Sequence, residues 1–331
     1  MSFIKKLQDF QSVSIVGMAK NTGKTTCLNY IIERLYAEGK SIALTSVGVD
    51  GEERDVLYDT PKPRIVLHEG MVFVTSEKDF SACEFPTEIL ATSERSTPLG
   101  RLVTARAKGS GKVVISGPSD SAWLQEILSE LPKFGVELTL VDGALSRMSL
   151  ASPAVTDALI LCTGAALSPH LENVIRQTKF RCDLIELPQV ENDLQQQLQA
   201  LENGIWSQHP TTNEWEKIGN SVFTNENIKN IFSEIYITGA ITDQFFKHIN
   251  TQKNHNTHII ANDFTKLFIT PQTYDKFRRN GGKISVLQKA KLLAVCTNPT
   301  SPEGASFDPE TLRSEMQNAL GISVYDVVAN S

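Results

Sequence analysis

A short segment near the N-terminus combines glycine, lysine and threonine in an order that suits phosphate binding. Gly17 and Gly23 stand with five residues between them, and Lys24 and Thr25 follow directly. Such an order is typical of loops that hold phosphate groups. Gly17 lets the backbone turn sharply, and Gly23 lets it approach a phosphate without a Cβ in the way. Successive backbone N–H groups and the positive end of a following helix then form a cradle for an anion.

A strand before the loop and a helix after it must hold this segment in place. Residues 13–16 form a short run rich in β-branched side chains, which predicts a strand. After the loop, apolar residues recur at the spacing of one helix face, namely Leu28, Ile31, Ile32 and Leu35. Gly39 stands where a helix commonly ends. The alternative is an ordinary strand-to-helix turn that binds no ligand.

The motif predicts a role for each loop residue. Lys24 is expected to reach the β- and γ-phosphates, and the Thr25 hydroxyl to join the shell of a Mg²⁺ ion. The predicted cofactor-binding residues are Gly17, Lys20, Asn21, Thr22, Gly23, Lys24, Thr25 and Thr26. The motif alone does not choose between ATP and GTP. Because the Asn-Lys-x-Asp and Thr-Lys-x-Asp sequences common in GTP-binding proteins are missing, we expect ATP and Mg²⁺ as cofactors.

Two carboxylates that follow predicted strands are candidate metal ligands. Asp50 lies just beyond a predicted strand at 40–47, and Asp142 directly follows the apolar run 136–141. The carboxyl ends of parallel strands meet at one edge of a sheet, so both acids are expected beside the phosphate loop. Asp142 is expected to hold a metal-bound water or to orient the attacking nucleophile, which makes it catalytic together with Lys24. A solvated acidic turn at Asp50 and a turn initiator at Asp142 are the alternatives.

Alternating strand and helix patterns predict an α/β fold. We expect a mostly parallel sheet of the P-loop NTPase type with helices on both faces. Short β runs at 64–68 and 71–75, joined by Glu-Gly, predict a hairpin insertion. The apolar run at 112–116 predicts a central strand, and the run at 184–187 predicts another strand.

A polar stretch rich in Gln, Glu and Asn at 189–204 predicts a linker or an exposed helix. We therefore expect a nucleotide-binding domain over residues 1–200 and a second, smaller α/β domain over 205–331. The second domain carries no complete catalytic constellation, and we expect it to offer a surface for a partner.

Composition limits the function classes. The formal net charge of −6 and the lack of Lys and Arg clusters argue against a nucleic-acid surface. Five widely spaced cysteines without a Cys-x-x-Cys pair make a disulfide or metal framework improbable and predict buried thiols. Residues 1–10 lack the apolar run of a signal peptide, and no run spans a bilayer, so we expect a cytoplasmic protein without a membrane partner.

Several segments together resemble one family, the smaller subunit of lysine 5,6-aminomutase reactivases. These segments are the loop 17–26, the acidic loop after the second predicted strand, Val-Asp-Gly-Ala-Leu-Ser-Arg at 141–147, Thr-Gly-Ala at 163–165 and Asn298-Pro299. The resemblance implies an ATP-dependent factor that helps to release damaged cobalamin from the adenosylcobalamin-dependent lysine 5,6-aminomutase. It also implies two partners, the mutase and a larger subunit that resembles the ATPase part of a mismatch-repair protein.

The first part of the chain also resembles a wider group that contains dethiobiotin synthetase and molybdenum-cofactor-associated GTP-binding proteins. Some members carry a lysine directly after the first loop glycine, where this chain has Met18, and its lysine stands at Lys20. An ATP-dependent ligase or kinase is therefore one alternative, in which Arg147 or Lys20 would hold a carboxylate. A nucleotide-binding scaffold without turnover is another.

Overall fold

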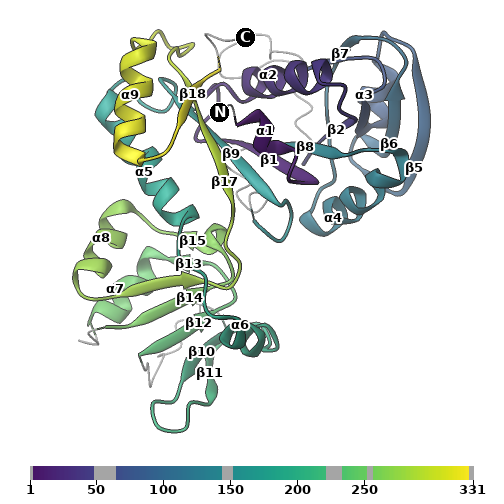
Figure 1. Ribbon diagram of the computed structural model, residues 1–331. Helices are drawn as coiled ribbons and strands as arrows, with labels where there is room; N and C mark the ends of the chain where they lie inside the picture. Colours follow the sequence, from purple (N-terminus) through teal and green to yellow (C-terminus); the bar gives the residue numbers. More distant parts are fainter. Residues whose placement is uncertain (1–2, 48–64, 144–151, 221–232, 252–255, 328–331) are drawn as a thin grey trace. The chain divides into compact units, whose positions relative to one another are not determined.

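The computed structural model describes residues 3–47, 65–143, 152–220, 233–251 and 256–327 and divides the chain into two units (Figure 1). Unit 1 consists of Met1–Lys179 and Leu292–Ser331, and unit 2 of Phe180–Lys291. Each unit combines strands with helices. The chain leaves unit 1 within helix α5 (Leu171–Ile185) and returns at strand β17 (Leu292–Asn298).

Unit 1 holds most of the secondary structure. Its remaining elements are α1 (Ile4–Leu7), β1 (Ser12–Gly17), α2 (Lys24–Ala37), β2 (Ile42–Ser46), β3 (Ile65–Leu67), β4 (Val72–Ser76), α3 (Glu77–Ser81), β5 (Thr87–Thr97), β6 (Gly100–Ala107), β7 (Gly111–Val113), α4 (Ser121–Glu130), the 3-10 turn η1 (Leu131–Phe134), β8 (Leu138–Gly143), β9 (Ala158–Gly164), α9 (Pro309–Leu320) and β18 (Val324–Asp326). The described part of unit 1 is thus a mixed α/β structure.

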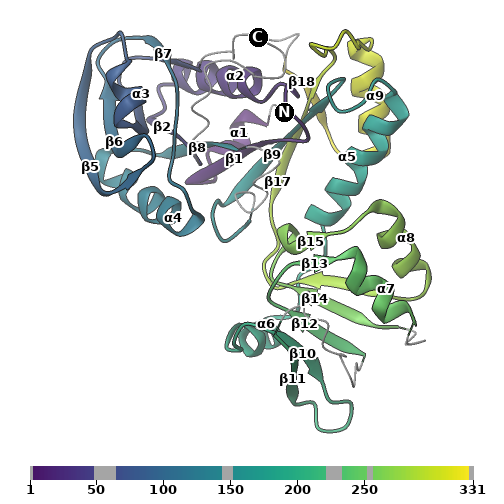
Figure 2. The ribbon, with the colours of Figure 1, turned by 180° about the vertical axis from the view of Figure 1, so that it is seen from behind.

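A nine-stranded sheet in the order β18-β17-β9-β1-β8-β2-β4-β6-β5 forms the centre of unit 1 (Figures 1 and 2). All neighbours from β18 to β4 pair in parallel, whereas β6 is antiparallel to both β4 and β5. Strands β1 and β9 are buried along their whole length, and β9 has the continuous apolar sequence expected of such a strand over residues 158–162. The predicted, mostly parallel sheet is confirmed.

Helices cover both faces of this sheet. On one face, α1 and α2 pack Leu7, Leu28 and Ile31 against strand residues such as Ile15 and Leu140. On the other face, Trp123 and Leu124 of α4 pack into two smaller clusters with residues of β2, β4 and β8. The alternation of side chains along each strand supplies apolar groups to both layers.

The predicted hairpin at 64–75 is wrong. β3 pairs with β7 in a separate two-stranded sheet, whereas β4 joins the large sheet between β2 and β6. A tight turn does form, with the N–H of Met71 donating to the carbonyl of His68, but the two strands then diverge. The antiparallel hairpin of unit 1 is formed instead by β5 and β6. The predicted central strand at 112–116 is likewise wrong, because β7 pairs only with β3.

The strand predicted at 184–187 is also wrong, because α5 continues to Ile185. Val174, Thr178, Cys182 and Ile185 are buried at intervals of three and four residues, which is the spacing of one helix face. Thr178 also forms a 2.8 Å hydrogen bond between its hydroxyl and that of Thr163 in β9. The helical pattern of burial therefore continues to Ile185, through the start of the predicted strand.

Unit 2 is a smaller α/β unit. It contains α6 (Asn192–Gln199), β10 (Ile205–Gln208), β11 (Trp215–Gly219), β12 (Glu234–Ile237), β13 (Ile241–Thr242), α7 (Asp243–Thr251), β14 (His258–Ala261), the 3-10 turn η3 (Phe264–Lys266), β15 (Leu267–Phe268), α8 (Pro271–Arg279) and β16 (Lys283–Val286). Its five-stranded sheet has the order β11-β10-β12-β14-β16, with β12, β14 and β16 parallel. His258 ties these three strands together, since its ring contacts Glu234 at 2.7 Å and Ser285 at 2.8 Å.

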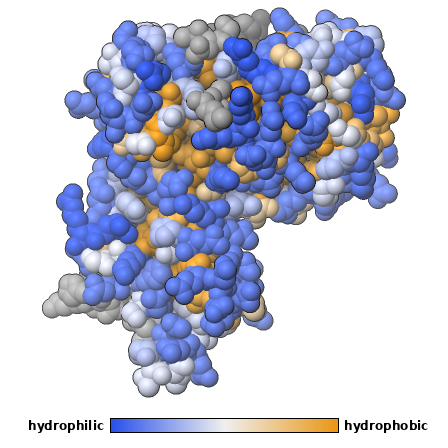
Figure 3. All heavy atoms as spheres, viewed as in Figure 1, coloured by the Kyte–Doolittle hydropathy of each residue, from blue (hydrophilic) through white to orange (hydrophobic). Residues whose placement is uncertain are grey.

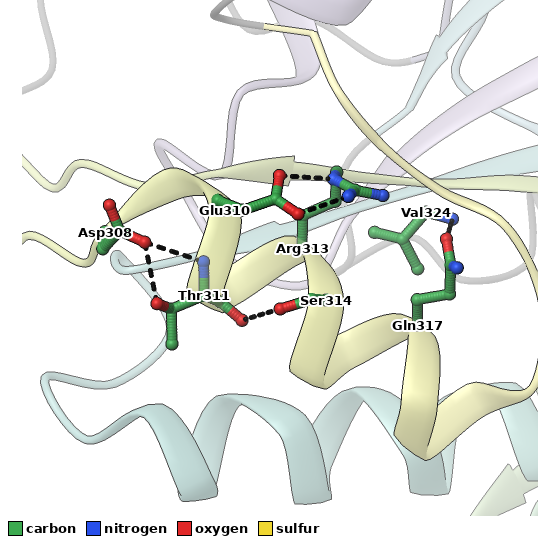
Figure 4. Close-up of polar contacts among 7 residues, drawn as sticks. All are labelled: Asp308, Glu310, Thr311, Arg313, Ser314, Gln317 and Val324. Atoms are coloured by element: carbon green, nitrogen blue, oxygen red, sulfur yellow. Dashed lines mark hydrogen bonds and ion pairs between the residues drawn. The ribbon is translucent and has the colours of Figure 1, made fainter.

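This division differs from the predicted boundary between 1–200 and 205–331. The final segment does not stay with unit 2, because β17 pairs with β9 and β18 pairs with β17. Helix α9 starts at a capped turn, where one carboxylate oxygen of Asp308 accepts hydrogen bonds from the Thr311 N–H and hydroxyl (Figure 4). Unit 1 is therefore built from two separate stretches of sequence.

Hydrophilic side chains cover most of the face shown in Figure 3, with apolar side chains between them. Among the described helices, none has the length and apolar character needed to cross a membrane.

Candidate functional site

The carboxyl ends of several parallel strands meet at one edge of the unit 1 sheet. Val16 lies level with Gly143, and Gly17 lies level with Cys162, so β1, β8 and β9 end together. On the far side of β9, Asn298 lies level with Gly164. Ligands of open α/β sheets bind in the crevice outside such strand ends.

The segment between β1 and α2 closes on itself at this edge. Thr22 is buried, and its hydroxyl donates a 2.9 Å hydrogen bond to the carbonyl of Ala19. Asn21 and Gly23 adopt positive φ angles of 59° and 87°. The commonest phosphate loop has four residues between its glycines, whereas this one has five. The two left-handed residues turn the longer loop back into α2.

Lys24 folds back over the start of the loop. A Cβ built on Gly17 would lie 2.9 Å from both Cγ and Cδ of Lys24 and 2.6 Å from the Thr22 hydroxyl oxygen. Only a residue without a side chain leaves room for the lysine stem at that place. The side chain of Lys24 therefore runs along the inner side of the loop, as a phosphate-binding lysine must.

The N-terminus of α2 has no side-chain cap. Its N-cap residue is Gly23, and the first hydrogen bond within the helix runs from the Cys27 N–H to the Gly23 carbonyl at 2.9 Å. In α4, α8 and α9, by contrast, Asp or Thr side chains cap the first turn. The backbone N–H groups of the first turn of α2 thus have no side-chain acceptor at the N-cap, which is the arrangement that a helix N-terminus uses to bind an anion.

Asn298 clamps the loop from a strand far away in the sequence. Its side-chain amide donates a 3.1 Å hydrogen bond to the carbonyl of Asn21, and its backbone carbonyl accepts one of 3.0 Å from the Ala165 N–H. A Cβ on Gly23 would lie 3.0 Å from the Cβ of Asn298. From the sequence, Asn298 stood out only as part of a family resemblance. The sequence signal that could have indicated a role for Asn298 was its position at the end of an apolar strand and before a proline.

Asp142 lies on the face of the sheet that α2 covers. It is level with Ile15 on β1, and residues level with each other on parallel strands point to the same face. Ile15 packs with the helix residue Leu28, so the half-buried Asp142 carboxylate is on the side of the sheet where α2 begins. Ser46 stands level with it on the other neighbour, β2, and donates a 3.1 Å hydrogen bond to the Asp142 carbonyl.

Apart from Asp142, the predicted site residues divide into three groups. Gly17, Thr22, Gly23 and Lys24 are brought together by the contacts described above. Asn21 forms part of the same loop, Thr25 and Thr26 follow in the half-buried first turn of α2, and Lys20 is exposed. Asp50 and Arg147 lie outside the described residues.

The described residues contain no group of three or more His, Cys, Asp or Glu side chains able to hold a metal ion. A Mg²⁺ ion does not need such a group, because it keeps several waters and uses few protein ligands when phosphates supply the others. The hydroxyl of Thr25 and the carboxylate of Asp142 are of the oxygen type that Mg²⁺ prefers, and they fit such a sparse donor set.

Comparisons with protein-family models, curated proteins and solved structures found no match for this chain.

Proposed function

We propose that the loop 17–25 binds the phosphates of a nucleoside triphosphate, and that unit 1 is a P-loop NTPase-like unit. One observation carries this proposal: the Lys24 stem lies across Gly17, at the entrance to a helix whose N-cap carries no side chain. The Lys24 ammonium group would then bind the β- and γ-phosphates, and the N–H groups of the first turn of α2 would donate to phosphate oxygens.

We further propose a Mg²⁺ ion beside this loop. When bound, the ion would neutralise charge on the phosphates. The Thr25 hydroxyl would hold it directly, and the Asp142 carboxylate would hold one of its waters or orient the attacking nucleophile. Asp50 is the third proposed ligand. The common face of Asp142 and α2 supports this arrangement.

The partner role rests on the family resemblance. We propose ATP as the nucleotide and a reactivating factor as the function, in which ATP turnover helps to release damaged cobalamin from lysine 5,6-aminomutase. The proposed partners are the mutase and a larger mismatch-repair-like ATPase subunit. Unit 2, a compact α/β unit of its own, would offer the surface for such a partner.

A small-molecule ligase would need a second anion site at the same edge, and helix α4 begins near it. Gly117 lies so close to β2 that its Cβ would fall 1.7 Å from the Ser46 carbonyl oxygen. However, the Asp120 carboxylate already caps α4, accepting a 2.9 Å hydrogen bond from the Trp123 N–H. A negative charge at that position repels a carboxylate substrate from the start of α4, so a ligase would have to hold its substrate with Arg147 or Lys20.

Calorimetric titration of the full chain with ATP, with and without Mg²⁺, tests the nucleotide site. We expect saturable binding that Mg²⁺ strengthens. In the Thr25→Ala variant, ATP should still bind but Mg²⁺ should add little affinity. Absence of saturable binding of either ATP or GTP at millimolar concentration would refute the proposal.

Turnover measurements separate the three functions. ATP hydrolysis that rises when the mutase or the larger subunit is added supports a reactivating factor, and Asp142→Asn should lower that rate while leaving ATP binding. Consumption of one small acid with stoichiometric ADP and no protein partner would indicate a ligase. Tight binding without turnover under every condition would indicate a scaffold.

A further inference from the structure

Three polar side chains from three neighbouring strands of unit 2 are joined by hydrogen bonds. Nδ1 of His258, the first residue of β14, lies 2.7 Å from a carboxylate oxygen of Glu234, the first residue of β12. Nε2 of the same imidazole lies 2.8 Å from the hydroxyl oxygen of Ser285 on β16. Glu234 is level with His258, whereas Ser285 is level with Ile260. One histidine therefore connects a carboxylate on one side with a serine on the other.

The carboxylate of Glu234 decides the direction of these hydrogen bonds. An ionised carboxylate can only accept, so the proton of a neutral His258 ring is on Nδ1. Nε2 then carries a lone pair, and the Ser285 hydroxyl donates to it. This is the arrangement of a serine nucleophile, a general base and a group that orients the base.

The three side chains lie on the face of the sheet that helix α6 covers, one layer nearer to its amino edge. Each of them stands two positions before a buried residue that packs with Leu198 of α6, and residues two apart on a strand share a face. These buried residues are Tyr236, Ile260 and Leu287. The apolar layer under α6 therefore ends where the polar residues begin.

Solvent reaches this polar layer. The side chains of Glu234 and His258 are 32% and 20% exposed. Ser285 is 8% exposed, whereas its chain neighbours Ile284 and Val286 are each 1% exposed. A small substrate would approach the serine hydroxyl from the amino edge of the sheet.

Lys283 places a positive charge on the same face. It stands two positions before Ser285, is level with His258 and is exposed. Attack of a hydroxyl on a carbonyl group produces a negatively charged oxygen, which a nearby cation stabilises. The amino edge of unit 2 thus combines a nucleophile, a base, an orienting carboxylate and a cation, which are the groups that acyl transfer needs.

We propose that Ser285, His258 and Glu234 form a catalytic triad that hydrolyses small carboxylic esters. The Ser285 oxygen attacks the carbonyl carbon while its proton passes to Nε2 of His258, and Lys283 stabilises the oxyanion. The intermediate then expels the alcohol, which takes that proton, and the acyl group stays on Ser285. Water attacks this acyl group in the same way and restores the serine. One ester and one water thus give one acid and one alcohol.

This activity goes beyond the proposed nucleotide site and does not depend on it. All residues of the triad belong to unit 2, whereas the loop 17–25 belongs to unit 1. The experiments below therefore contain no nucleotide, and their results are the same whether or not ATP binds.

Labelling of the full chain with a fluorophosphonate probe tests the triad directly. An activated serine attacks the phosphorus atom and displaces fluoride, and its proton leaves through the base, whereas an ordinary hydroxyl group reacts poorly. Trypsin cleaves after Lys283 and Lys289, and the peptide 284–289 contains Ser285 as its single hydroxyl residue. We expect the label on this peptide. A peptide 284–289 that stays unlabelled would overturn the proposal, whatever else is labelled.

Variants distinguish an activated serine from hydrogen bonds that only stabilise the sheet. Ser285→Ala should prevent labelling, and His258→Gln should slow it by about 100-fold or more, since a general base contributes about 10²–10⁴-fold. Glu234→Gln retains an acceptor for the imidazole without the charge and should slow labelling by about tenfold or more. Ser207→Ala is the matched control on the neighbouring strand β10, where Ser207 donates a 3.2 Å hydrogen bond to the Glu234 carbonyl. Its labelling rate should equal that of the unaltered protein.

Thermal unfolding shows whether each variant folds. If His258→Gln does not fold, Glu234→Gln supplies the comparison, and the mapping of the unaltered chain still decides. A folded His258→Gln or Glu234→Gln variant that is labelled as fast as the unaltered protein would show that the imidazole does not activate the serine, and the triad would be wrong.

Release of nitrophenol from p-nitrophenyl acetate measures the acyl step. The unaltered protein should release it faster than Ser285→Ala, and an acetyl group should be found on the peptide 284–289 when the reaction is stopped early. Equal rates for the two proteins would contradict the proposed activity.

Discussion

Lys24 is the single side chain on which the proposed chemistry depends most. Its stem contacts Gly17 closely, and it is only half-buried, so its charged end is not needed to fill the core. In the proposed site, this lysine would contribute binding energy to a ligand and little to folding. The residue types at 17–25 predicted this role from the sequence alone.

Replacement of Lys24 by alanine should weaken ATP binding strongly without unfolding the protein. Hydrogen bonds to charged groups contribute about 1.5–3 kcal/mol, so the loss should be about 10- to 100-fold in affinity. Calorimetric titration measures the affinity, and thermal unfolding checks the fold. Lys40→Ala is the matched control, because Lys40 lies just before β2, at the opposite edge of the sheet, and pairs with Glu137. Equal affinity of the Lys24→Ala variant and the unaltered protein would show that the site is misplaced.

Other residues of the site could not be predicted in the same way. Asn298 contacts Asn21 although 277 positions separate the two residues in the sequence. Local sequence patterns do not predict contacts between residues so far apart. Only the pairing of β17 with β9 in the structure places Asn298 beside the loop. The stretch 17–25 could be singled out from the sequence because its proposed chemistry depends on residues that are neighbours in the sequence.

At the scale of elements, the ends of β9 and β17 pack with almost no space between them. A Cβ on Gly164 would lie 1.9 Å from the carbonyl oxygen of Asn298, and this oxygen also accepts the hydrogen bond from Ala165. Backbone atoms cannot move aside as a side chain does. The close pairing holds Asn298 where it can clamp the loop.

Gly164→Ala should therefore destabilise unit 1 by at least about 1–3 kcal/mol, because the new methyl group forces the two strands apart. Thermal or urea unfolding measures the loss. Gly239→Ala is the control, since no heavy atom lies within 4 Å of the Cβ position there. If both variants unfolded like the unaltered protein, the tight pairing of β9 and β17 would be incorrect.

The N-terminal cap of α9 adds a dependence on pH. Hydrogen bonds from the Thr311 hydroxyl and then from its backbone N–H hold the pKa of Asp308 below its usual range (Figure 4). A carboxyl with a lowered pKa stabilises the folded state above its ordinary pKa, and this contribution disappears as the pH falls through the lowered value.

Asp308→Ala should lower the melting temperature at neutral pH and have little effect at a pH below both values, because the protonated carboxyl no longer accepts these bonds well. Melting curves between about pH 7 and pH 2.5 measure the difference. Asp308→Asn retains a capping oxygen and should lose less stability at neutral pH. A difference between Asp308→Ala and the unaltered protein that stays constant over this range would contradict the role of the carboxylate.

Most element types followed from local patterns, except the strand predicted at 184–187, where α5 continues to Ile185. Strand partners did not follow from them. The alternation in β3 and β4 predicted two strands, yet each found a different neighbour. Alternation records which face of a strand is buried and contains no information about the adjacent strand. For the same reason, an apolar run at 112–116 was mistaken for a central strand.

At the scale of the whole molecule, the first and last stretches of the chain form unit 1, and the stretch between them forms unit 2. Residues 292–327 return to the sheet that begins with β1, and they bring Asn298 to the loop. The polar stretch 189–204 predicted a second unit from the sequence, although it lies inside that unit, with α6, and not between the two units. The return of the chain to unit 1 was not predictable, because the sequences of β17 and β18 do not show which of the two sheets these strands join.

This arrangement makes the proposed site depend on both ends of the chain, since the loop comes from the first stretch and its clamp from the last. Three buried cysteines of the unit 1 core follow the same pattern, with Cys27 and Cys162 from the first stretch and Cys296 from the last. Between these stretches lies the loop 17–25, which we propose surrounds a nucleotide's phosphates.

A crystal structure of the full chain grown with Mg²⁺ and a non-hydrolysable ATP analogue tests that claim most directly. We expect the triphosphate between Gly17 and Thr25, with the Lys24 ammonium group on its outer phosphates and the ion bound by Thr25 with Asp142 nearby. A nucleotide bound at any other place, or a loop filled by its own side chains under these conditions, would contradict the account.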